Sequence, residues 1–236
     1  MKFDILTLFP EMFTNILNES IIGRAVKNKI VEFSFTNIRD FSGNKHNRVD
    51  DYPYGGGQGM VMMPQCIYGA YNSVAEKYEN KPHTVYLSPK GAVFTQDKAK
   101  ELAKKKNIVL LCGHYEGVDQ RIIDEIVDEE ISIGDYVLTG GEIPAMVVID
   151  AVCRMLDGVL SCEESFSDES HYSGLLEYPQ YTRPPEFLGK KVPEILLSGD
   201  HKKIEKWRFE KSVEETKLRR PDMYEKFIVK MYYNMV

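Results

Sequence analysis

Residues 108–117 read IVLLCGHYEG: five apolar residues lead directly into a polar loop with a glycine at each end. Residues 130–141, EISIGDYVLTGG, again place a short strand-like segment before a glycine-containing loop. Short apolar runs bounded by glycine indicate buried strands, and helical periodicity follows each of these two loops. The alternation of β and α segments predicts an α/β fold, with a parallel sheet covered by helices.

The same alternation continues outward from these two stretches. Strands are also expected within residues 3–9, 31–38 and 84–87, and helices within 10–17, 20–27, 65–78, 95–105, 118–126 and 143–156. Residues 39–63 are expected to form a long loop. Ligands of parallel sheets bind at the loops that follow the carboxyl ends of the strands. Three such loops, residues 88–91, 113–117 and 134–142, therefore predict one shared pocket.

The chain has 236 residues and a formal net charge of −6, which is unevenly distributed. Residues 1–175 contain 17 Lys and Arg against 26 Asp and Glu (net −9), whereas residues 176–236 contain 13 against 10 (net +3). The composition excludes a disordered or collagenous chain. No apolar run reaches the length of about 18 residues that predicts a membrane span, and residues 1–10 do not resemble a signal peptide. We expect a cytoplasmic protein.

Glycine, cysteine and histidine patterns exclude several site types. The cluster Gly55 to Gly59 is not followed by Gly-Lys-Ser/Thr and fits no G-x-G-x-x-G register, which disfavours a nucleoside triphosphate site and a nicotinamide dehydrogenase. The four cysteines form no C-x-x-C pair and the five histidines no H-x-x-x-H pair, so no metal site is predicted.

Taken together, the motifs resemble those of the bacterial tRNA (guanine-N1)-methyltransferases that act on guanosine 37, a family of the SPOUT class. The resemblance extends over almost the whole chain and is specific because many long matches occur in order. They are LFPEMF (8–13), GRAVK (23–27), DDYPYGGGQGM (50–60), YLSPKG (86–91), CGHYEGVDQR (112–121), SIGDYVLTGGEIPAM (132–146), GLLEYPQYTRP (174–184) and LLSGDH (196–201).

The resemblance implies a domain organisation. It indicates a catalytic domain at residues 1–160 with a deep trefoil knot in its C-terminal part, a flexible linker at 161–175 and a small all-helical tRNA-binding domain at 176–236. General rules of chain topology would favour an unknotted sheet, so the knot is expected from the family alone. The resemblance also implies a homodimer in which the second subunit completes each active site.

By resemblance, S-adenosylmethionine binds bent within the knot, in the pocket formed by the three loops. Backbone groups can read the adenine edge, glycines permit their close approach, and a carboxylate suits a cationic sulfonium. The expected cofactor-binding residues are Tyr86, Leu87, Ser88, Pro89, Gly113, Tyr115, Glu116, Ile133, Gly134, Asp135, Tyr136, Val137, Leu138, Gly140, Gly141 and Pro144.

The implied reaction requires a base, because N1 of guanine carries a proton at neutral pH, and a group that stabilises negative charge on O6. Arg154 matches the family's catalytic arginine and suits the second role. The family's base is a linker aspartate; counting back from Gly174 places Glu169 at its position, with Asp168 directly before it. Glu169 is assigned by register and Asp168 remains the alternative. The family also implies a dependence on Mg²⁺, for which no residue is assigned.

RNA contacts are expected in both parts of the chain. The implied partner is the anticodon stem-loop of tRNA with guanosines 36 and 37, held by the 39–59 loop, by residues 181–184 and by the C-terminal domain. The candidates are Arg24, His46, Arg48, Asp50, Arg183, Ser198, Gly199, His201, Arg208, Arg219 and Arg220. Two other functions stay open: another SPOUT RNA methyltransferase, acting on a ribose 2′-hydroxyl or on ribosomal RNA, and a non-catalytic RNA-binding module.

Overall fold

The computed structural model describes residues 1–160, 170–171 and 174–233. The chain divides into two compact units, Met1–Leu160 and Ser161–Val236, and each is described by itself. Within the described ranges, no helix combines the length and apolar composition needed to cross a membrane.

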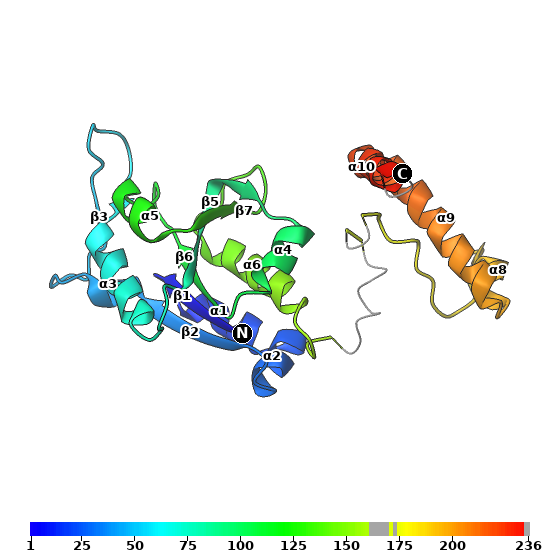
Figure 1. Cartoon of the computed structure of the whole chain (residues 1–236), viewed down its shortest axis with the longest axis horizontal. Coiled ribbons are helices and arrows are strands. Elements are labelled where there is room, and N and C mark those ends of the chain that lie inside the picture. The colour runs from blue at the N-terminus through cyan, green and yellow to red at the C-terminus, as the bar shows by residue number, and fades with distance from the viewer. Residues whose placement is uncertain (161–169, 172–173, 234–236) are drawn as a thin grey trace. The chain divides into compact units, whose positions relative to one another are not determined.

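Five strands of the first unit form one parallel sheet in the order β2-β1-β6-β5-β7 (Figure 1). The predicted parallel α/β sheet is therefore confirmed. The central strands β1 and β6 are buried along almost their whole length, as expected for apolar strands covered on both faces. The strands are β1 (Lys2–Thr7), β2 (Glu32–Asn37), β5 (His83–Val93), β6 (Asn107–Cys112) and β7 (Glu129–Ser132).

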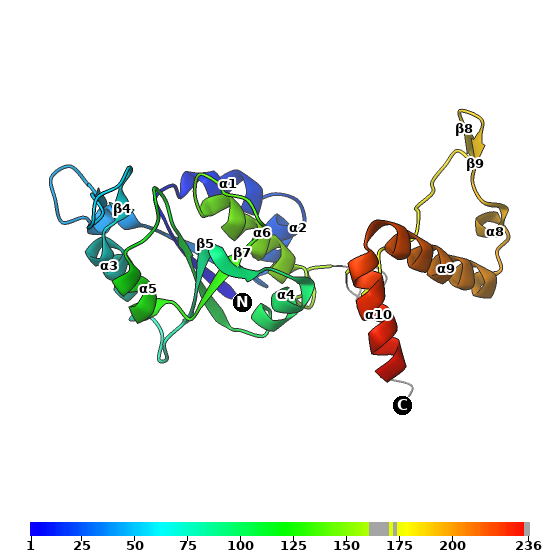
Figure 2. The same ribbon diagram turned by 90° about the horizontal axis from the view of Figure 1, so that it is seen from above.

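Helices cover both faces of the sheet and enclose two hydrophobic cores (Figure 2). Successive residues of a strand point to opposite faces, so Ile5 of β1 belongs to one core and Leu6 to the other. The first core lies beneath α1 (Glu11–Leu17), α2 (Ser20–Lys27), α4 (Gln96–Leu102) and α6 (Glu142–Cys153). The second lies beneath η1 (Ile38–Phe41), α3 (Pro64–Ala75) and α5 (Gln120–Ile126).

Strand β5 differs from the prediction at its carboxyl end. The sequence predicts a strand that ends at Leu87 and a loop at residues 88–91, but β5 continues to Val93. Leu87 and Ala92 both pair with Ile131, so the intervening residues bulge out of the ladder with β7. The bulge keeps Ser88, Pro89 and Lys90 beside the predicted pocket, because pairing on either side fixes both of its ends.

The expected long loop at 39–63 also contains regular structure. It includes η1 and an antiparallel pair, β3 (Asp50–Asp51) and β4 (Val61–Met62). Two backbone hydrogen bonds tie its end to the loop after β6: the Met62 amide donates to the Gly117 carbonyl (2.9 Å), and the Glu116 amide donates to the Met60 carbonyl (3.0 Å). These contacts are non-local, so a local reading of the sequence could not show them.

Among its described residues, 170–171 and 174–233, the second unit contains three helices and one hairpin. The helices are α8 (Glu194–Leu197), α9 (His201–Arg219) and α10 (Pro221–Tyr233). The prediction of an all-helical domain is wrong at residues 186–191, where β8 (Glu186–Phe187) and β9 (Lys190–Lys191) pair in antiparallel fashion. The connecting residues Leu188 and Gly189 both have positive φ (50° and 74°), the combination that two-residue hairpin turns of type I′ require.

Candidate active site

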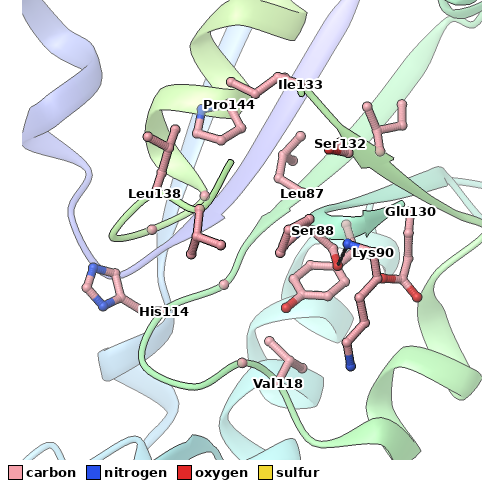
Figure 3. A pocket seen from close by; sticks show the side chains of 18 of the residues that line it. Leu87, Ser88, Lys90, His114, Val118, Glu130, Ser132, Ile133, Leu138 and Pro144 are labelled. Carbon is pink, nitrogen blue, oxygen red and sulfur yellow. Dashed lines mark hydrogen bonds between the residues drawn. The ribbon is translucent and has the colours of Figure 1, made fainter. Parts of the chain in front are cut away.

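A cavity of about 260 Å³ lies at the carboxyl ends of β5, β6 and β7. Its walls come from the β5 bulge, the loop after β6 and the loop between β7 and α6, so the three predicted ligand loops do meet at one place. Figure 3 shows Ile133, Leu138 and Pro144 on one side of the cavity and Ser88, Lys90 and Glu130 on the other. His114 lies on the same side as Leu138, so this side is mainly apolar and the other is polar.

All the residues predicted to bind the cofactor line this cavity except Asp135. Asp135 is exposed and lies at the centre of a tight turn, in which the Tyr136 amide donates to the Gly134 carbonyl (2.9 Å). In a three-residue turn of this kind the central side chain is directed away from the turn's hydrogen bond. The structure thus places Asp135 beside the cavity loop but outside the cavity lining.

Several lining residues were missed by the sequence analysis. Strand alternation could have identified Glu130 and Ser132, because these two residues share one face of β7 and the predicted pocket follows that strand. Lys90, His114, Gly117 and Thr139 lie within the three predicted ligand loops, and no comparable local signal marks the others. The missed residues are Lys90, His114, Gly117, Val118, Gln120, Ile123, Glu130, Ile131, Ser132 and Thr139.

Glycines bring the two principal loops into contact. The Gly141 amide donates to the Gly113 carbonyl (2.9 Å), and a Cβ atom at Gly141 would lie 2.7 Å from the Cα of Cys112. A Cβ atom at Gly113 would lie 2.8 Å from the Tyr86 ring. These glycines therefore allow the chain to pack against itself, in addition to any approach they allow to a ligand.

Burial shifts the pKa values of two groups at or next to the cavity, Tyr86 and Cys112. It raises the pKa of Tyr86 to about 12, with a further contribution from the negative charge of Glu130, so the phenol stays protonated at neutral pH. Burial also raises the pKa of the Cys112 thiol, and the nearby charge of Glu142 adds to this effect. Glu142 is itself buried and accepts a hydrogen bond from the Thr7 hydroxyl (2.7 Å). A protonated phenol and thiol offer no nucleophile for covalent catalysis.

Comparison with known proteins gives the chain's family. The family model described as tRNA (Guanine-1)-methyltransferase TrmD matches residues 1–226. A tRNA (guanine-N(1)-)-methyltransferase of Ruminiclostridium cellulolyticum is 63% identical over 226 residues, which cover 96% of this chain and 97% of the relative. One of Clostridioides difficile is 58% identical over 227 residues, covering 96% and 98%. The chain belongs to the TrmD family. The resemblance found in the sequence is thereby confirmed.

The arginine expected from the TrmD pattern lies far from the cavity along its own helix. Arg154 is partly buried and forms the C-terminal cap of α6, whereas Pro144, near the first turn of the same helix, lines the cavity. Ten residues at a rise of 1.5 Å separate them by about 15 Å. The two expected bases, Asp168 and Glu169, lie outside the described residues.

The RNA candidates of the first unit lie at its surface. Arg24 is exposed on α2, and His46 and Arg48 are exposed between η1 and β3. Asp50 is half-buried in β3, and its carbonyl accepts a hydrogen bond from Nε of Arg48 (2.8 Å). Arg48 also lies 3.3 Å from a carboxylate oxygen of Asp51. An acidic neighbour reduces the charge that this arginine presents to a phosphate.

The RNA candidates of the second unit differ in their surroundings. Arg208 is half-buried, with its guanidinium carbon 4.9 Å from the centre of the Tyr178 ring. Arg219 is hydrogen-bonded to Glu215, and Arg220 to Asp222 at 2.7 and 2.8 Å. The remaining candidates are exposed: Arg183, Ser198, Gly199 and His201. The carboxylate partners of Arg219 and Arg220 reduce the charge that these two arginines present to an RNA phosphate.

No residue set for the magnesium implied by the TrmD pattern is present in the described part of the chain. Among residues 1–160, 170–171 and 174–233, no three His, Cys, Asp or Glu side chains are grouped so that they could hold a metal ion. Mg²⁺ prefers several oxygen ligands in near-octahedral geometry. The described residues therefore hold no cluster of three or more such side chains for a resident magnesium ion.

Proposed function

We propose that the protein transfers a methyl group from S-adenosylmethionine to N1 of guanosine 37 in tRNA, next to the anticodon. The observation that carries the proposal is the family match over residues 1–226. The cavity at the ends of β5, β6 and β7 supports it, because fifteen of the sixteen residues expected to hold the cofactor line that single cavity, Asp135 being the exception.

The donor set around the cavity suits S-adenosylmethionine. Leu138 and Pro144 form an apolar side against which an adenine ring can pack, and loop backbone groups there can bond its edge. Glu116 and Glu130 supply negative charge beside a cationic ligand. When bound, the cofactor supplies an electrophilic methyl group on a sulfonium. The chain's own task is to hold that methyl group in line with the guanine and to exclude water.

The base that removes the N1 proton is proposed to be Glu169, with Asp168 as the alternative by one residue of register. A carboxylate at either position can accept the proton as N1 attacks the methyl group. Arg154 is proposed to donate hydrogen bonds to guanine O6, where negative charge accumulates as the proton leaves. The roles of the base and of Arg154 both follow from the family pattern. They are supported by the reaction itself, which requires a proton acceptor for N1 and a hydrogen-bond donor for O6.

A knotted cofactor domain is part of the proposal. Strand β7 lies at the edge of the sheet, beyond β5, yet Gly141 at the end of the following loop packs against Cys112 and Gly113 at the end of β6. The chain thus returns from the edge across the end of β5 to reach the interior of the sheet. A return of this kind supports the trefoil knot implied by the family.

We further propose that the protein acts as a homodimer with composite sites. The separation of about 15 Å along α6 between Arg154 and the cavity-lining Pro144 supports this, because a second subunit offers a way to place an Arg154 beside the cavity. An exposed apolar surface on the adjacent helices α1 and α6 suits the subunit contact: Met12, Ile16, Ile143 and Val147 are each 43–55% exposed. Each pair has i, i+4 spacing and therefore lies on one helix face.

Complementation tests the composite site. Arg154→Ala and Gly141→Ala each damage one half of the proposed site, and the two purified variants are mixed, unfolded and refolded together. Random pairing makes half of the dimers mixed, and each mixed dimer has one intact site, so about one quarter of wild-type activity should return. Refolded mixtures with no activity above the separate variants would contradict a site shared between subunits.

We also propose three parts of the chain: a catalytic domain at residues 1–160, a linker at 161–175 and a tRNA-binding domain at 176–236. Its net charge of +3 and exposed basic residues support RNA binding.

The most direct test of the proposed substrate is a methyl-transfer assay on tRNA transcripts. Transcripts with guanosine at positions 36 and 37 should be methylated, replacement of guanosine 37 should abolish the reaction, and replacement of guanosine 36 should slow it. Methylation that persists without guanosine 37 would overturn the proposal.

A further inference from the structure

Glu130 holds a buried polar atom without a partner. Its Oε2 atom is inaccessible to solvent and accepts no hydrogen bond from any residue that the structure describes, and the side chain lines the cavity. Buried carboxylate oxygens in native proteins are nearly always hydrogen-bonded. An unpartnered oxygen on the side chain of a cavity-lining residue therefore points to a donor that the ligand supplies.

The sheet geometry explains why Glu130 faces the cavity. Successive side chains of β7 point to opposite faces. Glu129 is directed to the other face, where it lies 2.7 Å from His83 and 3.0 Å from Lys98. Glu130 pairs in register with Tyr86 of β5, which also lines the cavity. The two adjacent glutamates thus have separate environments, one in contact with His83 and Lys98 and one facing the site.

The surroundings of Glu130 form the polar side of the cavity. Figure 3 shows Ser88, Lys90 and Glu130 together there, across the cavity from Leu138 and Pro144. The Ser88 hydroxyl accepts a hydrogen bond from the Lys90 amide (3.2 Å). A ligand with an aromatic part and a zwitterionic part would match these two sides, because the apolar side suits the ring and the polar side offers both an anion and a cation.

We propose that Glu130 binds the α-ammonium group of the amino-acid tail of S-adenosylmethionine. The inference rests on the proposed function, which supplies the identity of the ligand, and it extends that function to a residue outside the family-derived site. With the adenine ring against the apolar side, the tail reaches the polar side, where its ammonium is the strongest hydrogen-bond donor available to the unpartnered oxygen. Lys90 at the same side offers its charge to the tail's carboxylate.

Calorimetric titration of Glu130→Gln with three ligands tests this assignment. S-adenosylmethionine and S-adenosylhomocysteine both carry the ammonium, and only the first carries the sulfonium. 5′-Methylthioadenosine carries neither. Loss of a charge-assisted hydrogen bond should weaken the binding of the first two ligands by about 10- to 100-fold. Binding of 5′-methylthioadenosine should match wild type, which also shows that the variant's cavity is folded.

Glu125→Gln is the matched control. Glu125 is exposed on α5 and does not line the cavity. The Glu125→Gln variant loses the same charge as Glu130→Gln and should bind all three ligands as the wild-type protein does. Equal affinity of Glu130→Gln and wild type for S-adenosylmethionine would overturn the inference. So would a loss confined to S-adenosylmethionine, which would assign Glu130 to the sulfonium. Failure of the wild-type protein to bind any of the three would instead overturn the proposed function.

Discussion

Replacing Gly141 with alanine tests how the cavity is built. The new Cβ atom would lie 2.7 Å from the Cα of Cys112 and 2.9 Å from the Gly113 amide nitrogen, against 3.4–4 Å for ordinary contact. Both neighbours are backbone atoms, which cannot rotate away as a side chain would. The loop before α6 must therefore move from the end of β6 by about 1 Å.

This displacement should affect stability and function to different degrees. Gly141 has φ −81° and ψ −6°, which alanine adopts without strain, so the cost comes from overpacking alone, about 1–3 kcal/mol. The melting temperature should fall by about 3–10 °C. Because the two loops form adjoining walls of the cavity, a shift of about 1 Å should reduce methyl transfer by about 100-fold.

The assay pairs thermal unfolding with calorimetric titration of S-adenosylmethionine and the rate of methyl transfer. Gly69→Ala, in the middle of α3 and outside the cavity, is the control: its Cβ atom would lie 3.1 Å from the movable ring of Phe41. The gain in helix propensity of about 1 kcal/mol should offset that contact. Wild-type cofactor affinity and melting temperature for Gly141→Ala would refute the reasoning that this contact shapes the cavity.

Two further predictions concern carboxylates. One of the variants Glu169→Ala and Asp168→Ala should lose nearly all methyl transfer while binding S-adenosylmethionine as wild type does, measured by single-turnover kinetics and titration; near-normal rates for both would exclude a base at this position. Burial raises the pKa of Glu129, but hydrogen bonds from His83 and Lys98 outweigh it and leave the pKa below its usual value. A lowered carboxyl pKa stabilises the folded state above the unfolded pKa and loses this effect as the pH falls through the folded pKa. Glu129→Gln should therefore lower the melting temperature by about 2–4 °C at pH 7 and by less at pH 4; an equal decrease at both would contradict the ion-pair explanation.

Much of the first unit's fold could be predicted because its signals are local. The apolar run of β6 and the helical periodicity after it need no tertiary information. The end of β5 could not be predicted in this way: Pro89 and Gly91 suggest a loop, and only pairing of Ala92 with Ile131 shows that the strand resumes. Its bulge is a property of two strands together.

The hairpin at residues 186–191 illustrates a different difficulty. Two-residue strands are too short for an alternating pattern, and Leu188 is an unusual residue at a position with positive φ, where asparagine, aspartate or glycine is common. Gly189 was the one local signal. The pairing of Glu186 with Lys191 becomes visible only in the structure.

The candidate site could be predicted as a set of loops but not as a set of contacts. Family motifs brought Tyr86, Gly113 and Leu138 to one pocket, and these three do line one cavity. Glu130 carried no motif signal, since two adjacent glutamates on a strand are not distinguishable by composition. Their different roles follow from the face to which each is directed.

The nucleoside produced in tRNA tests the central claim most directly. The protein is incubated with S-adenosylmethionine carrying a labelled methyl group and with a tRNA containing guanosines 36 and 37, and the digested nucleosides are separated and identified by mass. The account predicts label in 1-methylguanosine at position 37. Label in a 2′-O-methylated nucleoside, or no label above a reaction without the protein, would contradict it.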